Sequence, residues 1–476
     1  MDATPNRKRH RMTAPCTNGA QTGARVHCIG QRCLLLAAAC VIGGADALLT
    51  SPRRGPRRGA ALGAKTTQTI YITDGVGDPF PIKPHKPRRA ASGKKGFAAA
   101  AAAAPDGAFG KLCRWVAKKG GKSDGVAVGD VGGGLRGVVA TRDFAVGDTV
   151  FSVPKAECVL SEGRADASPV AEVWRVLPAP APHVRVALLL LYLERVERKA
   201  WAPLLDVLPS PADLSAPGPM RLWAPAEVAE TQDPQLVERV GAQVAADDAA
   251  YDDVVVPGWT AADFGDPPTR DAFKIAVATI TSRAKGERTA KAQRERSSYM
   301  LVPLADLCNH RDPAGSNAAE ALAPWGHFVV AASRRVRAGE EIRVSYGALP
   351  NRALLAQFGF QLPLDDDDAP LLDVADALAA ADAAAVDACA VEGLLARDAR
   401  RAVDRWQRAG PNLEAAAAAL GIDYAALLGR ALAACATTLE ADEAAAAAGG
   451  QDPRLAEALA FRIPNKAYLA AHGTPP

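Results

Sequence analysis

Three short stretches in the second half of the chain decide how the rest is interpreted. They are PLADLCNH (Pro303 to His310), GEEIRVSYG (Gly339 to Gly347) and QFGF (Gln357 to Phe360). An apolar segment leads into Asp306 and the pair Asn309–His310, a combination that could serve catalysis or metal binding. Metal binding is disfavoured because no second His, Cys or carboxylate follows at ligand spacing. General-base catalysis by His310 stays open on residue type alone.

Together the three stretches resemble the closing half of a SET domain, in the branch typified by the Rubisco large-subunit lysine methyltransferase. The resemblance implies an α+β fold of small curled sheets with a pseudoknot. We expect this SET domain over residues 109–362, with a helical insert at about 165–298. Residues 363–476 would be an all-α, substrate-binding domain, and residues 1–108 a presequence and disordered linker.

Two segments of the chain repeat one pattern, which supports small sheets independently of the resemblance. TRDFAVGDTVFSV (Thr141 to Val153) and SRRVRAGEEIRVS (Ser333 to Ser345) each predict a strand, a turn centred on Gly, and a second strand. Between them the pattern is helical: Val186 to Val196 is apolar, and Phe273, Val277 and Ile280 fall at helical spacing. Ala/Leu-rich helices follow Leu362 and predict a bundle.

The glycine-rich stretch GGGLRG (Gly132 to Gly137) matches the spacing of a dinucleotide-binding loop. That interpretation requires a helix to begin there and hold a pyrophosphate, whereas the pattern predicts a strand at Val138 to Thr141. A loop that merely turns is the plain alternative. In the SET family such a loop wraps the cofactor, and on that basis Gly134 and Leu135 are expected to contact it.

The resemblance also assigns the remaining site residues. It implies that Arg283 grips the carboxylate of S-adenosylmethionine, which a guanidinium does with two parallel hydrogen bonds. It places Asn309 and His310 on the cofactor and Asp306 near the same pocket, although Asp306 could equally be a local cap. Phe358 departs from the family, which has Tyr at this point, and is expected to keep an aromatic wall beside the cofactor.

Tyr346 is the expected catalytic residue. Methyl transfer to nitrogen is largely a positioning problem, because little proton chemistry is needed at the carbon. The target lysine must however lose its charge, and an apolar channel lowers its pKa. The Tyr hydroxyl can orient the amine and accept weak C–H···O contacts from the methyl group.

Charge is divided unevenly along the chain. The whole chain carries a net charge of +3, but Lys and Arg are concentrated in residues 1–97. The remainder is therefore acidic, which argues against nucleic-acid binding. Five cysteines outside the leader are scattered and show no CxxC spacing, so neither a disulfide framework nor a zinc site is expected.

The N-terminal region is expected to be a targeting sequence. Basic residues precede the apolar run Cys33 to Ile42, which is too short to span a membrane. A stretch with Arg and Thr and no acid between Asp46 and Asp74 follows, as in transit peptides. We expect plastid import; secretion, or a disordered tail on a cytoplasmic protein, are the alternatives.

These observations predict an S-adenosylmethionine-dependent protein-lysine N-methyltransferase with a non-histone protein substrate. No metal, nucleic-acid partner or stable membrane association is expected. A protein-histidine N-methyltransferase is the nearest alternative, because one branch of the family modifies an actin histidine. A protein that keeps the fold and binds without turnover is the alternative from another class.

Overall fold

The computed structural model describes residues 70–72, 80–82, 107–132, 135–286, 299–363, 369–398 and 402–474. The leader, Gly134 and the acidic cluster at 365–368 lie outside the described residues. All described residues belong to one unit, Thr67–Pro476.

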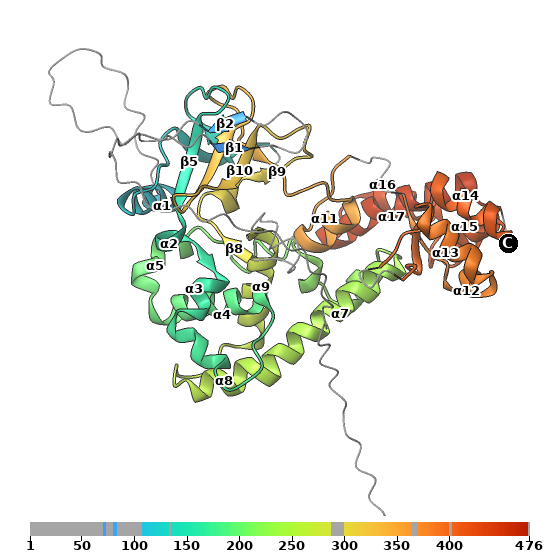
Figure 1. Ribbon diagram of the computed structural model, residues 1–476, viewed down its shortest axis with the longest axis horizontal. Coiled ribbons are helices and arrows are strands. Elements are labelled where there is room, and N and C mark those ends of the chain that lie inside the picture. The colour runs from blue at the N-terminus through green and yellow to red at the C-terminus, as the bar shows by residue number, and fades with distance from the viewer. Residues whose placement is uncertain are drawn as a thin grey trace, which may run out of the picture. The chain divides into compact units, whose positions relative to one another are not determined.

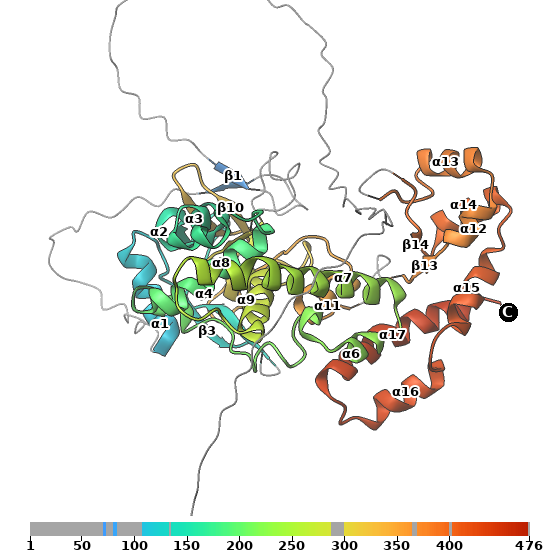
Figure 2. The same cartoon turned by 90° about the horizontal axis from the view of Figure 1, so that it is seen from below.

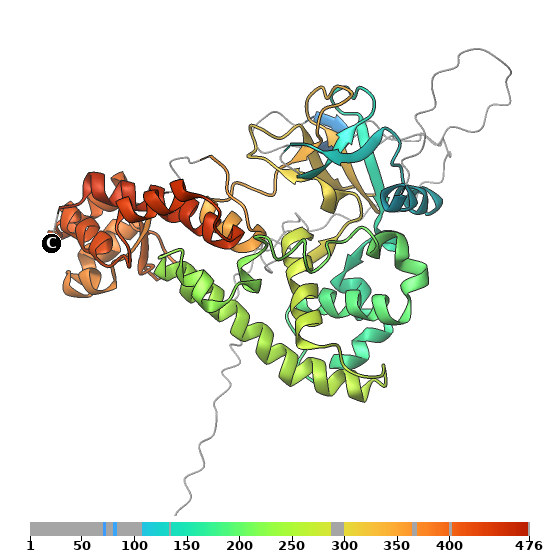
Figure 3. The same ribbon diagram turned by 180° about the vertical axis from the view of Figure 1, so that it is seen from behind.

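The strands form several small sheets, as predicted. β3 (Val126–Asp130) and β4 (Arg136–Ala140) make a hairpin, and β10 (Ala318–Leu322), β11 (His327–Ala332) and β5 (Thr149–Pro154) make a three-stranded antiparallel sheet. β8 (Tyr299–Leu301) lies between β6 (Leu160–Ser161) and β7 (Lys285–Gly286). Figures 1 and 3 show these strands gathered together, with the helices of the insert beside them.

The two repeated segments pair with each other. Phe144 and Val336 form an antiparallel bridge, and the glycines predicted to turn, Gly147 and Gly339, have φ of 79° and 88°. Positive φ favours glycine because it has no Cβ. The predicted first strand of each segment is only this single bridge. The Asp143–Arg335 ion pair and a hydrogen bond from the Ala338 N–H to Asp143 reinforce this bridge, so the two segments are joined by a short contact rather than by a long ladder.

A two-residue parallel pair fixes the position of the Tyr346 segment. β9 (Asn309–His310) pairs with β12 (Arg343–Val344), with Arg343 opposite Asn309 and Val344 opposite His310. Parallel pairing places the residues that follow the two strands at the same edge. Tyr346 therefore lies beside the Asn-His pair, although 36 residues separate it from His310.

The described part of the insert is mainly helical, and its buried residues belong to one apolar core that they share with the small sheets. α4 (Pro182–Val196) buries a continuous apolar run and packs against α9 (Arg270–Arg283), as Figure 1 shows. α9 ends at Arg283 and is followed by β7 at Lys285–Gly286, and residues 287–298 of the predicted insert lie outside the described residues. Among the described residues before the C-terminal region, inside and outside the insert, the other α-helices are α1 (Gly107–Lys118), α2 (Lys155–Cys158), α3 (Glu162–Asp166), α5 (Arg198–Leu205), α6 (Pro225–Ala229), α7 (Pro234–Ala250), α8 (Val256–Ala261) and α11 (Asn351–Phe358). The same described residues contain 3-10 helical segments at Pro169–Trp174, Met220–Leu222 and Ala305–Leu307, and a π-helical turn at Tyr251–Val255.

The C-terminal region has its own core, but it is not all helical. Strands β13 (Leu371–Asp373) and β14 (Trp406–Arg408) form an antiparallel pair that the alanine-rich composition did not predict. Around them lie α12 (Ala375–Ala380), α13 (Ala383–Val391), α14 (Pro411–Leu420), α15 (Tyr424–Ala433), α16 (Leu439–Ala448) and α17 (Pro453–His472). In the described part of the chain no single helix is long and apolar enough to cross a membrane; α14 and α15 meet that test only together, and they are bent by 116°.

α17 joins the C-terminal helices to the insert. It contacts α15 and α16 along one part and α6 and α11 along another, which Figure 2 shows. Ala458 and Phe461 of α17 share a small apolar cluster with Leu236 of α7 and Leu355 of α11.

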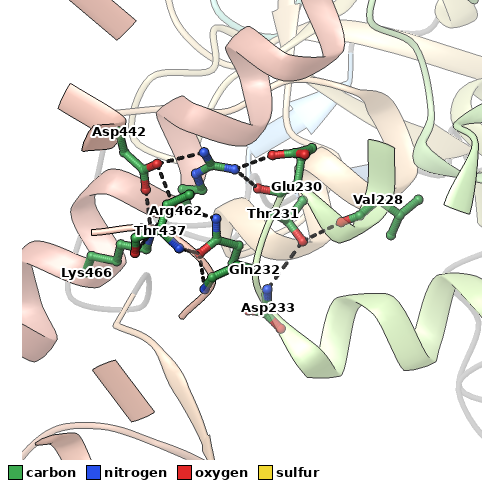
Figure 4. Close-up of polar contacts among 10 residues, drawn as sticks. Val228, Glu230, Thr231, Gln232, Asp233, Thr437, Asp442, Arg462 and Lys466 are labelled. Carbon is green, nitrogen blue, oxygen red and sulfur yellow. Dashed lines mark hydrogen bonds and ion pairs between the residues drawn. The ribbon is translucent and has the colours of Figure 1, made fainter. Parts of the chain in front are cut away.

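A buried polar network reinforces this junction (Figure 4). Asp442 of α16 is 1% exposed and contacts both Arg462 and Lys466 of α17. Arg462 also pairs with Glu230, and Gln232 bonds to Thr437. The carboxylate is fully paired, which a buried charge requires.

The segment that was predicted to be a disordered linker contains a pair of strands. β1 (Ile70–Ile72) and β2 (Phe80–Ile82) run antiparallel, with Ile70 opposite Ile82. Residues 50–108 were expected to be disordered throughout, from their Pro, Gly and basic composition. Each of the two strands contains β-branched Ile, a residue type that favours strands. The average composition of residues 50–108 did not reveal this local preference.

Candidate active site

Tyr346 is held from both ends of the residue. Its backbone N–H donates to Nδ1 of His310 at 3.0 Å, and its hydroxyl donates to the carbonyl of Cys308 at 2.8 Å. The ring stacks on His310 with centroids 4.9 Å apart, and Phe358 lies 5.0 Å away on another side. Burial raises the pKa of the phenol, and Lys285 and Arg283 oppose that shift. Tyr346 therefore stays protonated at neutral pH, in one fixed orientation.

His310 positions Tyr346 rather than acting as a base. The ring is 4% exposed, and burial lowers its pKa to about 4. Its Nδ1 lone pair already accepts the hydrogen bond from Tyr346. Two cavities adjoin Tyr346 and are described below. Asn309 lines one of them, whereas His310 lines neither. The side chain of His310 thus supports Tyr346, while the expected contact of His310 with the cofactor stays a prediction.

A cavity of about 500 Å³ opens on one side of Tyr346. It brings together residues from distant parts of the chain that were predicted to share a site: Leu135, Arg283, Asp306, Asn309 and Phe358. Arg136, Asp213 and Phe360 also line it and were not predicted. A volume of this size is typical of small-molecule sites.

The cavity carries both signs of charge. Arg283 donates from one Nη to the carbonyl of Asp306 at 2.9 Å, and its buried Nε has no hydrogen-bond partner among the described residues. Burial lowers the pKa of Arg136, and the neighbouring Arg283 lowers it further. Two guanidinium groups near each other in a cavity form a site for an anionic group such as a carboxylate.

Asp306 supplies the opposite charge. It is 4% exposed, and within the described part of the chain neither carboxylate oxygen has a hydrogen-bond partner. Burial raises its pKa, while Arg283, Lys285 and Arg136 oppose the shift. This absence of partners favours a ligand-facing role for Asp306 over a local cap, which would accept a backbone N–H. Unpaired buried oxygens beside two cations suit a ligand that carries an ammonium and a carboxylate together.

Asn309 closes the cavity by tying two strands together. Its side-chain amide donates to the carbonyl of Arg136 at 3.0 Å and to Glu341 Oε1 at 2.8 Å. A Cβ at Gly137 would lie 2.9 Å from this amide nitrogen and 2.8 Å from the Glu341 carboxylate. A side chain at position 137 would therefore displace the Asn309 amide and the Glu341 carboxylate from their hydrogen bond. The stretch GGGLRG runs into β4 and not into a helix, so the dinucleotide-binding interpretation is wrong.

A second cavity, of about 570 Å³, opens on the other side of Tyr346. Ser282, Arg283, Tyr346 and Phe358 line both cavities, so they form the wall between them. Lys285 lines the second cavity with its Nζ 4.4 Å from the centre of the Tyr346 ring. Glu320 Oε1 lies 3.1 Å from that nitrogen.

The residues that prediction missed differ in how visible they were. Arg136 stands inside GGGLRG, directly after Leu135, and its charge in a ligand-binding loop was a usable signal. Lys285 and Glu320 lie in segments without a motif, and only the folded structure brings them together.

Comparisons with known proteins find similar sequences and a similar fold. Residues 135–347 match the family model for the SET domain. The chain is 29% identical over 249 residues to the chloroplastic ribulose-1,5 bisphosphate carboxylase/oxygenase large subunit N-methyltransferase of Nicotiana tabacum, covering 49% of this chain and 47% of that protein. It is 26% identical over 238 residues to the N-lysine methyltransferase setd6 of Xenopus laevis, covering 48% and 51%. The chain thus spans about half the length of these curated relatives.

A solved structure extends the likeness of the fold. The SET domain of LSMT bound to lysine and AdoHcy superposes with a TM-score of 0.57 at 20% sequence identity, over 77% of this chain and 90% of that one. The predicted fold class is confirmed: residues 135–347 match the SET-domain family model, and the fold is that of the Rubisco large-subunit methyltransferase structures.

Proposed function

We propose that the chain is an S-adenosylmethionine-dependent protein-lysine N-methyltransferase acting on a non-histone protein. One observation carries the proposal: two cavities meet at a wall that contains Tyr346. One suits a charged small ligand and the other is open for an acceptor side chain. Relatives with lysine methyltransferase names support the reaction class.

The residues of the first cavity fit S-adenosylmethionine. Its amino-acid end carries a carboxylate, for which Arg283 and Arg136 are partners, and an ammonium, for which the unpaired Asp306 oxygens are acceptors. Leu135 and Phe358 offer apolar surface beside them. When bound, the cofactor supplies an electrophilic methyl group on a sulfonium.

The protein's own contribution is to orient and desolvate the acceptor. The Tyr346 hydroxyl donates a hydrogen bond to the carbonyl of Cys308. The lone pairs of its oxygen therefore remain available to accept a hydrogen bond from an acceptor amine. The rings of Phe358 and Tyr346, 5.0 Å apart, give this wall an apolar face that favours a desolvated acceptor. Because the phenol is fixed at both ends, little entropy is lost when the acceptor aligns.

Transfer can be tested with the full chain, S-adenosylmethionine labelled in the methyl group, and a protein extract from plastid stroma. We expect label on a discrete protein band, located on a lysine by mass spectrometry, and lost with Tyr346→Phe. Label on a histidine would establish the histidine methyltransferase instead. Cofactor binding without label, in stromal and cytosolic extracts alike, would support a binding protein without turnover.

The leader supports a second proposal, that the chain is imported into plastids. Its basic, acid-poor composition is typical of transit peptides, and the tobacco relative is named as chloroplastic. A fluorescent protein fused behind residues 1–104 should accumulate in plastids of a host cell. Fluorescence that stays in the cytoplasm or is secreted would contradict this location.

A further inference from the structure

A partly buried ion pair lines the second cavity. Lys285 and Glu320 are 9% and 17% exposed in their side chains, and Lys285 Nζ lies 3.1 Å from Glu320 Oε1. The same nitrogen is 4.4 Å from the centre of the Tyr346 ring, close enough for a cation–π contact. A positive charge is thus fixed where an acceptor amine would approach the phenol.

The fold fixes the positive charge of Lys285 beside the wall that contains Tyr346. Lys285 is the second residue after α9 ends and sits in β7, whose backbone pairs with Met300 of β8. Glu320 comes from β10, a strand of a different sheet. A buried ion pair is weak evidence for stability, since apolar residues of similar volume often stabilise as well or better. The pair therefore calls for a role in the site.

Lys285 is held in its charged form. Burial lowers the pKa of Lys285, whereas the charge of Glu320 and the hydrogen bond to it raise that pKa; the net shift is upward. The ionisable groups that act on it or feel its charge come from several elements: Glu320, Tyr346, Cys308, Asp306 and His310. A lysine held as an ammonium has no lone pair, so Lys285 is not itself an acceptor of the methyl group.

Resting on the proposed methyltransferase function, we propose that Lys285 is a positioning residue whose fixed positive charge makes the acceptor nitrogen bind as the neutral amine. An ammonium would meet this charge at close range, whereas a neutral amine can approach both it and the Tyr346 oxygen. At a separation of roughly 6 Å and an effective dielectric constant of about 20, one unit charge shifts an amine by about two pH units. Glu320 offsets part of this, so the expected shift is on the order of one unit.

The test uses ε-N-methyl-L-lysine carrying ¹³C in the methyl group, whose NMR shift reports protonation of its amine. The full chain is saturated with S-adenosylhomocysteine, so that no transfer occurs, and the bound probe is titrated between pH 7 and 11. Wild type should lower the pKa of the bound amine below its free value. In Lys285→Met/Glu320→Gln, which removes both charges without leaving one buried alone, this pKa should rise by about one unit.

The conservative variant and the control outcomes make the test decisive. Lys285→Arg keeps the charge and should retain the wild-type pKa of the probe. Equal pKa values for the probe in wild type and in the double variant would overturn the role of Lys285, with the proposed function intact. Failure of the probe to bind any variant that still binds S-adenosylhomocysteine would overturn the acceptor site itself.

Discussion

Acidification should weaken the folded state through His310 in a measurable way. Its pKa is lowered by burial to about 4 in the folded protein, against about 6.5 in an unfolded chain. Between these values the unfolded chain binds more protons, so stability falls as pH falls. The contribution is fully present above about pH 6.5 and is lost progressively toward pH 4.

The size of the effect follows from the same two values. From pH 7 to pH 4.5 the His310 contribution to the free energy of unfolding should fall by roughly 2.5 kcal/mol. The chemical reason is local: a protonated Nδ1 cannot accept the Tyr346 N–H, so the bond that fixes Tyr346 is broken. Loss of stability and loss of the site's geometry should occur together.

His310→Asn isolates this contribution. Its amide oxygen can accept the Tyr346 N–H in place of Nδ1 and does not titrate in this range. Urea unfolding, followed by tryptophan fluorescence at pH 7 and pH 4.5, gives the free energy lost on acidification for each protein. All other titrating groups are shared, so the variant should lose roughly 2.5 kcal/mol less than wild type. Equal losses of unfolding free energy in wild type and variant would refute the claim that His310 is buried and neutral and holds Tyr346 in place.

Three further changes have defined outcomes. Arg283→Met should weaken S-adenosylmethionine binding about 10- to 100-fold in calorimetric titration, since a charge-assisted bond contributes about 1.5–3 kcal/mol; unchanged affinity would place the cofactor elsewhere. Asp442→Ala should cost about 3–5 kcal/mol of stability in urea unfolding, because Lys466 is left buried without a counter-charge, whereas the exposed Glu440→Ala should cost under about 0.5 kcal/mol. Gly258→Ala should cost at least about 1–3 kcal/mol, because its Cβ would lie 1.9 Å from the Val173 carbonyl oxygen, while Gly241→Ala, which meets nothing within 4 Å, should be neutral or slightly stabilising; similar melting temperatures for the two would contradict the packing of α8.

Prediction from sequence succeeded where chemistry and local pattern coincide. Arg283, Asn309 and Tyr346 each end a recognisable helix or motif, and the structure brings all three to one cavity. The turns at Gly147 and Gly339 were visible because a positive φ leaves glycine as the natural choice.

It failed where a partner distant in sequence decides the outcome. The hydrogen bond from the Tyr346 N–H to His310 depends on the β9–β12 pair, which residue type alone could not predict. Glu320 gained its significance only through Lys285, on another sheet. The strand pair β13–β14 was hidden in an alanine-rich region because helix propensity is overridden by tertiary pairing.

A crystal structure of the full chain with S-adenosylhomocysteine tests the central claim most directly. We predict the carboxylate of the ligand at Arg283, its ammonium at Asp306, and its sulfur directed at the wall formed by Tyr346 and Phe358. Ligand bound in the cavity of Lys285 and Glu320, or away from Tyr346 altogether, would contradict the assignment of the two cavities and the reaction built on it.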